Sequence, residues 1–352
     1  MMCTRRLTLV LAALLPAGLA SPTPVSQQFK REVISGKYII TLREDVAVSD
    51  VSSHLNWVSD VHRRRLNKRT TVGIENTYNI STWNTYAGEL DDETIQQVKD
   101  NPEVATVEED TVMYLWSAGD SSISERALTT RGLETIANRN SGSTSHIYDT
   151  SAGANTYTYI VDGGVLTTHN QFGGRATLGY NVVGGSHVDT LGHGTNVAGT
   201  IGSADIHHQA NLISVMVFSG AAGTTSTVLD NYNWAVNDIT YTSRQTRCAI
   251  NLSIGGPASS AWTSSVNAAY SSGALSVVAA GNGDENGNSP CFEPIAWECP
   301  ECVDRAGVDT FASGVSVFSS YNGSNTATQS RNGTSMATPQ LVIWSCSVSR
   351  GS

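Results

Sequence analysis

An aspartate, a histidine and a serine, each placed close to glycine, could together carry out nucleophilic catalysis. Asp162 follows the apolar run Tyr-Ile-Val, His193 lies within Gly-His-Gly-Thr, and Ser335 lies within Gly-Thr-Ser-Met-Ala. A serine hydroxyl is a weak nucleophile at neutral pH unless a histidine accepts its proton, and the imidazole needs a carboxylate to fix its tautomer. Backbone N–H groups at the start of a helix can also bind an oxyanion. The three residues together predict a Ser-His-Asp triad.

Each of these signals has an ordinary structural alternative. An aspartate after a strand is most often a turn residue, and a histidine between two glycines is most often part of a loop. The order Asp, His, Ser makes the combination much more specific than its parts. It also argues against an esterase of the α/β-hydrolase fold, because that triad runs Ser, Asp, His and its Gly-x-Ser-x-Gly motif does not occur in the sequence.

The composition is that of a globular protein with an acidic balance of charges. Of the 352 residues, 39% are hydrophobic and 15% are charged, which is enough apolar material for a sizeable core. The formal net charge is -10 at pH 7. A nucleic-acid-binding surface requires clustered Lys and Arg, and the one basic run, Arg63 to Arg65, is short. We therefore expect no nucleic-acid partner.

The first residues have the pattern of an export signal. Arg5 and Arg6 precede an apolar run from Leu7 to Leu15, and small residues stand before Ser21, where a signal peptidase would cut. The run is shorter than the ~20 apolar residues that a membrane-spanning helix needs. We therefore predict a signal peptide at residues 1–20, secretion to the extracellular space and no membrane anchor.

The cysteines leave their pairing open. Removal of the signal peptide leaves five of the six cysteines, so at least one thiol lacks a disulfide partner within the mature chain. Cys299 and Cys302 have the spacing of half a zinc site, but no second pair or histidine follows them. This pattern favours a disulfide or free thiols over a metal.

Residues 37–114 form a unit with its own pattern of elements. Lys37 to Leu42 and Val104 to Val107 read as strands, and the spacing of Val51, Leu55, Val58 and His62 predicts a helix that Ser49 or Asp50 would cap. A second helix is predicted over 92–98, ended by Pro102. The sequence thus predicts a small α+β domain, followed by a polar linker over 115–126.

From residue 156 the pattern changes to short apolar strands that alternate with longer helices. The strands are predicted at 157–161, 212–215, 249–253 and 275–278, and the clearest helix at 228–239. This β-α-β order is typical of a doubly wound parallel sheet, an α/β fold whose active groups lie near the carboxyl ends of the strands.

The chain resembles the fungal secreted subtilisin-like serine proteases of the proteinase K and oryzin group. The resemblance covers most of residues 127–340, and residues 37–114 resemble the inhibitory propeptide of the same family. The matching stretches are YIVDGGV, DTLGHGTNVAGTIGS, ANLISVMVF, the run from VLDNYNWAVNDI to NLSIGGP, LSVVAAGN and NGTSMATP. The resemblance implies an inhibitory propeptide at 21–126, a cut near Arg126 that exposes Ala127, and a peptidase domain at 127–352.

The same resemblance implies a role for each site residue. Ser335 would be the nucleophile, His193 the general base and Asp162 the orienting carboxylate. Asn282 would donate to the oxyanion. The residues that would bind substrate main chain and wall an apolar specificity pocket are Ser253, Ile254, Gly255, Gly256, Ala279, Ala280 and Gly281. The implied partners are protein or peptide substrates and the chain's own propeptide, with the protein acting as a monomer.

Several positions depart from the family pattern. Gly163 stands where relatives have Thr or Ser after the catalytic acid, which removes a hydroxyl that could support the carboxylate. Asn196 replaces a histidine outside the triad. Residues 291–304 replace a segment that holds a calcium ligand in relatives, so no cofactor is required and structural calcium has little support. The apolar helix after Pro339 is short, and we expect the peptidase domain to be incomplete at its C-terminus.

Four glycosylation sequons begin at Asn79, Asn251, Asn322 and Asn332. A glycan at Asn251 or Asn332 would obstruct the predicted cleft, so Asn322 is the predicted site. The sequence thus predicts a secreted serine endopeptidase of broad specificity that works through an acyl-enzyme. The alternative is an impaired or inactive relative, which Gly163 and the short C-terminus favour.

Overall fold

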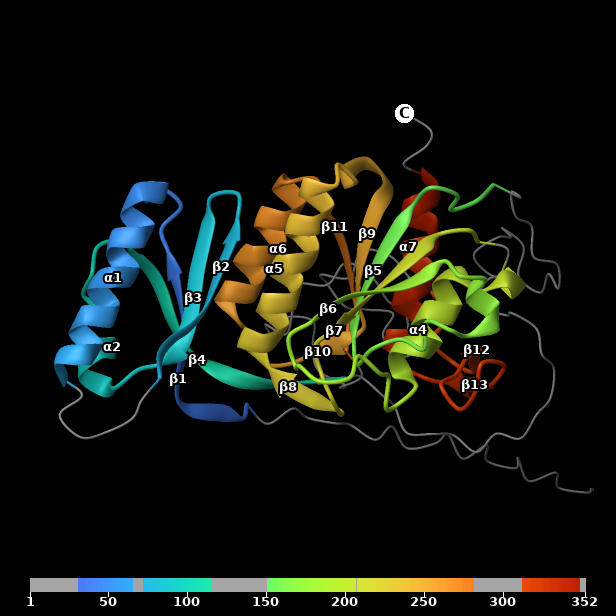
Figure 1. Ribbon diagram of the computed structural model, residues 1–352, viewed down its shortest axis with the longest axis horizontal. Coiled ribbons are helices and arrows are strands. Elements are labelled where there is room, and N and C mark those ends of the chain that lie inside the picture. The colour runs from blue at the N-terminus through green and yellow to red at the C-terminus, as the bar shows by residue number, and fades with distance from the viewer. Residues whose placement is uncertain (1–30, 66–71, 116–150, 207, 282–311, 349–352) are drawn as a thin grey trace, which may run out of the picture.

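The computed structural model describes residues 31–65, 72–115, 151–206, 208–281 and 312–348. The predicted signal peptide, the linker after residue 115 and the cut near Arg126 lie outside these ranges, as does Asn282. The described chain forms two large β-sheets, with helices before, between and behind them, and a separate two-stranded sheet of β12 and β13 (Figure 1).

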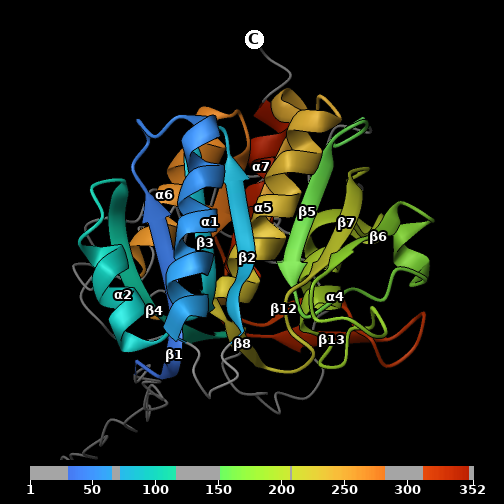
Figure 2. The same ribbon diagram turned by 60° about the vertical axis from the view of Figure 1, so that its left-hand side comes forward.

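The N-terminal unit is an antiparallel sheet covered on its outer face by two helices (Figure 2). The strand order is β4-β1-β3-β2, and every pair among these strands is antiparallel. The elements are β1 (Val33–Leu42), α1 (Val48–Arg65), β2 (Gly73–Ile80), β3 (Trp83–Glu89), α2 (Asp92–Lys99) and β4 (Val104–Leu115). The predicted α+β class is confirmed, although the sequence did not reveal the β2–β3 hairpin.

The two helices of this unit differ in how well their starts were predicted. Helix α1 begins at Val48, so the prediction that Ser49 or Asp50 precedes it was wrong, and Asp50 lies in its first turn. Helix α2 is capped by Asp91, whose side chain accepts hydrogen bonds from the backbone N–H groups of Glu93 and Thr94. Its buried face contains Thr94, Ile95 and Val98, as the apolar spacing requires.

The larger unit is built on a five-stranded parallel sheet in the order β11-β9-β5-β7-β6. The strands are β5 (Tyr157–Asp162), β6 (Ala176–Asn181), β7 (Asn211–Met216), β9 (Cys248–Leu252) and β11 (Leu275–Val278). Four of the five match strands expected from the sequence, and β6 was not expected. The predicted parallel α/β fold is therefore confirmed.

Helices cover both faces of the parallel sheet. Helices α5 (Thr225–Tyr241) and α6 (Ser260–Ser271) lie between the two sheets, and α4 (His193–Gly202) and α7 (Thr334–Val348) lie on the far face (Figure 1). The remaining elements are η1 (Asn170–Phe172), η2 (Ala204–Ile206), β8 (Ala222–Thr224), η3 (Gln245–Arg247), β10 (Ile254–Gly255), β12 (Val317–Ser320) and β13 (Thr328–Arg331).

The core between the sheets follows from the periodicity of α5. Its apolar positions recur every three or four residues, so they form one stripe on the helix. Six apolar residues on this stripe are buried, at Val228, Leu229, Tyr232, Ala235, Val236 and Ile239, whereas Trp234 is partly buried and Tyr241 is exposed. This stripe packs with Tyr159, Ile250 and other residues of the parallel sheet, together with Ile39 and Trp83 of the N-terminal unit, in one continuous cluster. The two units thus share a hydrophobic core.

Strand β4 also connects the units through backbone hydrogen bonds. Its C-terminal end is inserted between β8 and β10, and it is antiparallel to both. Leu115 is opposite Ile254 and Tyr114 is opposite Gly255. On the other edge, Met113 is opposite Gly223. The end of the N-terminal unit therefore occupies a gap in the larger unit as an added strand.

Two carboxylates on β4 cap the two helices that lie between the sheets. Glu108 accepts hydrogen bonds from the Ser260 backbone N–H at 2.9 Å and from the Ser260 hydroxyl at 2.7 Å, at the start of α6. Asp110 accepts from the backbone N–H and the hydroxyl of Ser226, at the start of α5. Negative charge at a helix N-terminus is stabilising, because the first N–H groups lack partners within the helix.

The buried cap at Asp110 predicts a specific pH dependence of stability. Burial raises the pKa of Asp110 above its ordinary value of 3.8, although hydrogen bonds from Ser226 and Thr111 oppose the shift. A carboxyl with a raised pKa in the folded state stabilises the fold below pH 3.8, and this contribution is lost as the pH rises through the raised pKa. The free energy of unfolding of the Asp110→Asn variant should lack this decrease.

The measurement is urea unfolding of the full chain between about pH 3 and about pH 7, in a Ser335→Ala background that prevents self-cleavage. The control is Glu109→Gln on the same strand, because the Glu109 side chain is 50% exposed. A difference between the parent and Asp110→Asn that stays constant across this pH range would contradict the prediction.

Candidate active site

Asp162 is the last residue of the central strand β5, so it lies at the carboxyl edge of the sheet. Its Oδ2 and Oδ1 atoms lie 2.9 Å and 3.0 Å from Nδ1 of His193. The backbone N–H of Gly163 donates to Oδ1 at 2.7 Å. Asp162 is 0% exposed, and a buried carboxylate is costly unless such donors surround it.

His193 is the first residue of α4. Each of the two glycines beside it is required by a different feature of the backbone. Gly192, the N-cap residue, has φ of 71°, a left-handed conformation that favours glycine. Gly194 packs against the main chain, because a Cβ there would lie 2.1 Å from the carbonyl oxygen of Gly164 and 3.0 Å from Asp162 Oδ1. The Gly-His-Gly motif therefore lets the imidazole meet the carboxylate at close range.

A second aspartate holds the start of α4 in place of a capping side chain. Asp189 accepts hydrogen bonds from the backbone N–H groups of Leu191 at 3.0 Å, Gly192 at 2.7 Å and Thr195 at 2.9 Å. It also accepts from the Thr195 hydroxyl at 2.6 Å. Burial raises the pKa of Asp189 above its ordinary value, and the hydrogen bonds from Thr195 act in the opposite direction. Asp189 thus fixes the turn from which His193 emerges.

Ser335 is the second residue of α7, and Pro339 shapes its surroundings. Proline has no N–H, so the carbonyl oxygen of Ser335, four residues earlier, has no helical donor. The hydroxyl of Ser253 donates to that oxygen at 2.9 Å, and the Ser335 hydroxyl donates to the carbonyl oxygen of Ser253 at 3.1 Å. Asn251 holds the Ser253 hydroxyl through Nδ2 at 2.9 Å. The predicted nucleophile is therefore tied to the segment that follows β9.

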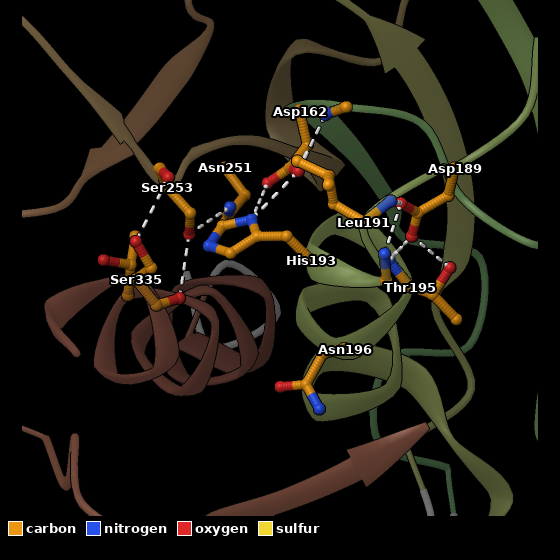
Figure 3. A network of polar contacts seen from close by, with 12 residues as sticks. Asp162, Asp189, Leu191, His193, Thr195, Asn196, Asn251, Ser253 and Ser335 are labelled. Carbon is orange, nitrogen blue, oxygen red and sulfur yellow. Dashed lines mark hydrogen bonds and ion pairs between the residues drawn. The ribbon is translucent and has the colours of Figure 1, made fainter. Parts of the chain in front are cut away.

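The structure brings the three predicted triad side chains into one buried cluster. The imidazole of His193 lies between the Asp162 carboxylate and the Ser253–Ser335 pair (Figure 3). A hydroxyl carries one proton, and that of Ser335 is directed at Ser253 in this conformation. Rotation about the Cα–Cβ bond of Ser335 is the step that would turn this proton toward the imidazole.

Asp162 receives a hydrogen bond at position 163 even though glycine has no hydroxyl. The sequence suggested a lost hydroxyl at this position, but the backbone N–H of Gly163 donates to the carboxylate whichever side chain is present. The space above Gly163 is occupied by the N-terminal unit, because a Cβ there would lie 3.3 Å from Cδ1 of Leu115. The next nearest atom, the carbonyl oxygen of Phe218, would lie at 3.9 Å. Glycine therefore makes room for Leu115 beside the Asp162 carboxylate.

The predicted substrate-binding residues lie at the same edge of the sheet. Ile254 and Gly255 form β10 and pair with Leu115 and Tyr114, while Ser253 contacts Ser335. A Cβ at Gly256 would lie 2.9 Å from the Met113 side chain, so this glycine also permits close approach of β4. Ala279, Ala280 and Gly281 follow β11, and the N–H of Ala279 donates to Leu252 at 3.0 Å.

Two predicted features of the site, Asn282 and the segment 291–304, fall outside the residues that the structure describes. Within the described ranges, no group of three or more His, Cys, Asp or Glu side chains could hold a metal ion. None of the described helices is long and apolar enough to cross a membrane.

Asn322, the predicted glycosylation site, donates from Nδ2 to the carbonyl oxygen of Asp189 at 2.8 Å.

Sequence reasoning missed Asp189 as a functional residue. The local signal was present, because an aspartate three residues before a glycine that begins a helix is placed to accept N–H groups of the first turn. Asn196 stands where relatives have a histidine outside the triad. It is fully buried in α4, and its Nδ2 donates to the carbonyl oxygens of Ser320 and Gln329 at 3.3 Å and 3.0 Å.

Comparisons with known proteins agree with this geometry. Residues 37–116 match the family model described as peptidase inhibitor I9, and residues 160–299 match the subtilase family model. An alkaline proteinase of Hapsidospora chrysogena is 48% identical over 363 residues, which covers 97% of this chain and 88% of the relative. Alkaline protease 1 of Aspergillus clavatus is 43% identical over 367 residues, with coverage of 97% and 88%.

Two solved structures are also similar. A cold-adapted subtilisin-like serine proteinase matches with a TM-score of 0.51 and 28% identity, over 62% of this chain and 83% of that one. Fervidolysin from Fervidobacterium pennivorans matches over 93% of this chain and 56% of that one, with a TM-score of 0.60. Its identity is 17%, so this second match shows the fold alone.

The Asp162–His193 contact predicts the effect of removing one charge. Asp162→Asn keeps the size of the side chain but favours the wrong imidazole tautomer, so kcat should fall by about 10⁴-fold with little change in KM. The measurement is peptide hydrolysis at saturating substrate, with Asp205→Asn as an exposed control. A loss in kcat smaller than about tenfold would mean that Asp162 does not orient the base.

Proposed function

Since the chain belongs to the subtilase family and is a serine endopeptidase, we propose that Ser335, His193 and Asp162 carry out its reaction. The observation that carries this assignment is the buried hydrogen bond of 2.9 Å between Asp162 Oδ2 and His193 Nδ1, next to Ser335.

The proposed mechanism follows from these positions. His193 Nε2 accepts the Ser335 proton as Oγ attacks the scissile carbonyl, and Asp162 stabilises the imidazolium that forms. The imidazolium then protonates the leaving amine, which leaves an acyl-enzyme on Ser335. Water activated by the same histidine hydrolyses that ester. Backbone N–H groups at the start of α7 are placed to stabilise the oxyanion, and Asn282 is the proposed side-chain donor.

The edge strand β10 is the proposed binding site for the substrate main chain. Tyr114 and Leu115 occupy it in the described structure as an antiparallel strand. Main-chain pairing of this kind accepts many sequences, because side chains contribute only through pockets. The substrates are therefore proteins or peptides, and the proposed specificity is broad with a preference for apolar residues.

The N-terminal unit, which matches an inhibitor family, is proposed to hold the enzyme inactive. It occupies β10, and its carboxylates cap both α5 and α6. Release would require a cut within the linker 115–126. We propose that the protein is made as a secreted precursor, as its similarity to fungal alkaline proteases and its N-terminal sequence both suggest.

The alternative of an inactive relative has less support. One of its two grounds was the loss of a hydroxyl at Gly163, and the backbone N–H at that position already donates to Asp162. The donors to the carboxylate and the occupied substrate strand both fit a working enzyme.

Covalent labelling distinguishes the two functions. A fluorophosphonate should form an adduct with Ser335 in the processed enzyme and none with the Ser335→Ala variant, because only an activated hydroxyl attacks the phosphorus. Mass spectrometry of peptides locates the adduct, and gel electrophoresis of the Ser335→Ala variant should show an uncleaved precursor. A folded sample of the parent that carries no adduct at Ser335 would support the inactive relative.

The contact between Gly163 and Leu115 predicts a preference in substrates. Leu115 is opposite Ile254, and the next residue of the edge segment, Ser253, contacts Ser335. A substrate side chain at the Leu115 position is therefore the second one before the scissile bond. Gly163→Ala should lower the ratio of kcat/KM for leucine over alanine at that position by about tenfold, because the added methyl meets the leucine.

The measurement uses two peptides that differ only at that residue. Leu115→Ala in the full chain is the matched change on the other side of the contact. The effects of the two substitutions on inhibition of the peptidase unit by the N-terminal unit should be non-additive. A leucine-to-alanine ratio that Gly163→Ala leaves at its parent value would place this side chain elsewhere.

A further inference from the structure

The turn before His193 has its carbonyl groups held by two side chains from a distant hairpin. Nδ2 of Asn322 donates to the carbonyl oxygen of Asp189 at 2.8 Å, and Nη2 of Arg331 donates to that of Leu191 at 2.7 Å. Asn322 lies in the turn between β12 and β13, and Arg331 is the last residue of β13. We propose that Asn322 and Arg331 are positioning residues that hold the general base His193 in its productive orientation.

The backbone of the turn at residues 189–192 has N–H groups that bind acceptors and carbonyl groups that bind donors. Gly192 has no side chain to cap α4, so Asp189 satisfies the N–H groups of the turn with its carboxylate. The carbonyl oxygen of Asp189 is partly buried, where an unpaired backbone acceptor is costly, and that of Leu191 is more exposed, where Arg331 fixes its direction. Asn322 and Arg331 donate to these two oxygens, so both the N–H groups and the carbonyl groups of the turn have side-chain partners.

The hairpin also packs against the turn. A Cβ at Gly192 would lie 2.1 Å from the ring of Tyr321 and 2.6 Å from Oδ1 of Asn322, so the hairpin touches the residue next to His193. The guanidinium of Arg331 lies 5.5 Å from the centre of the Tyr321 ring. Close packing of this kind leaves the turn little freedom to shift without moving the hairpin.

Further contacts attach the hairpin along α4. The hydroxyl of Ser319 donates to the carbonyl oxygen of Asn196 at 2.7 Å, and the Asn196 amide donates to Ser320 and Gln329 on the two strands. Asn196 thus replaces a family histidine with a side chain that bonds to both strands. The anchored hairpin can therefore transmit its position to the start of α4.

The same hairpin leads directly to the nucleophile. Arg331 precedes Ser335 by four residues, and its side chain reaches the residue two before His193. One short segment therefore connects the base and the nucleophile. A displacement of about 1 Å in such an arrangement can reduce a rate about 100-fold.

The position of Asn322 in a sequon makes a competing role testable. A glycan attached to Nδ2 would replace one hydrogen of the amide and add bulk beside Gly192, where the hydrogen bond to Asp189 lies. The inference therefore assigns the Asn322 amide to positioning and predicts that it carries no glycan. This inference rests on the proposed role of His193.

The experiment compares Asn322→Ala with Ser324→Ala in the processed full-length enzyme. Ser324→Ala destroys the sequon but keeps the amide of Asn322, so it is the matched control. We expect Asn322→Ala to lower kcat about 10- to 100-fold with KM within about twofold, and Ser324→Ala to match the parent. Asn322→Asp, which has the same size but no N–H donor at neutral pH, should resemble Asn322→Ala.

The division of the effect between kcat and KM separates positioning from a general loss of stability. If the turn moves His193 out of its productive orientation, substrate still binds but turnover slows, so the loss should fall on kcat. Active sites are counted by fluorophosphonate titration, so unfolded material does not enter kcat. A variant with the parent kcat would overturn the proposal, as would equal losses in Asn322→Ala and Ser324→Ala.

Arg331→Ala decides the question if Asn322→Ala gives no folded enzyme. A kcat lowered about 10- to 100-fold with KM within about twofold supports the proposal, and a parent-like kcat overturns it. Failure of the unsubstituted enzyme to label at Ser335 would refute the catalytic roles as well. Labelling of the parent together with parent-like variants would refute the positioning roles alone.

Discussion

The buried hydrogen bond between Asp162 and His193 constrains the rest of the catalytic unit. A carboxylate with no exposed surface at the end of β5 must be surrounded by donors, and it receives them from the imidazole and from the next backbone N–H. The imidazole can approach only because Gly194 lets α4 pack on the main chain. The start of α4 is in turn fixed by Asp189. Each of these features follows from the burial of the Asp162 carboxylate.

The position of Ser335, the proposed nucleophile, depends on a hydrogen bond that the helix α7 lacks. Pro339 removes the donor that would engage the carbonyl oxygen of Ser335, and the hydroxyl of Ser253 fills that gap. The same segment continues into β10, which pairs with the end of β4. The missing helical hydrogen bond thus links Ser335 to the segment that leads into β10, so the proposed nucleophile and the proposed substrate strand share one short piece of chain.

The N-terminal unit uses the same surfaces that a substrate would need, and additional ones. It adds a strand at the active-site edge, and it also supplies carboxylates to the first turns of α5 and α6. Helices gain stability from such caps, so the unit stabilises the elements that cover one face of the parallel sheet as well as pairing with β10. The shared core through Ile39 and Trp83 extends this contact. Inhibition and stabilisation of the larger unit are therefore properties of one interface.

The sequence by itself determined the local elements and the chemical types at the site. Apolar periodicity located α5 and four parallel strands, and glycine-flanked motifs identified Asp162, His193 and Ser335, because both signals depend on neighbours in the chain. Tertiary structure decided what depends on distant segments. It paired β4 with β10, turned Gly163 into space for Leu115, and brought Asn322 and Arg331 to the turn before His193. No local pattern encodes these contacts, because their partners lie far apart in the chain and meet only when the sheets and helices pack.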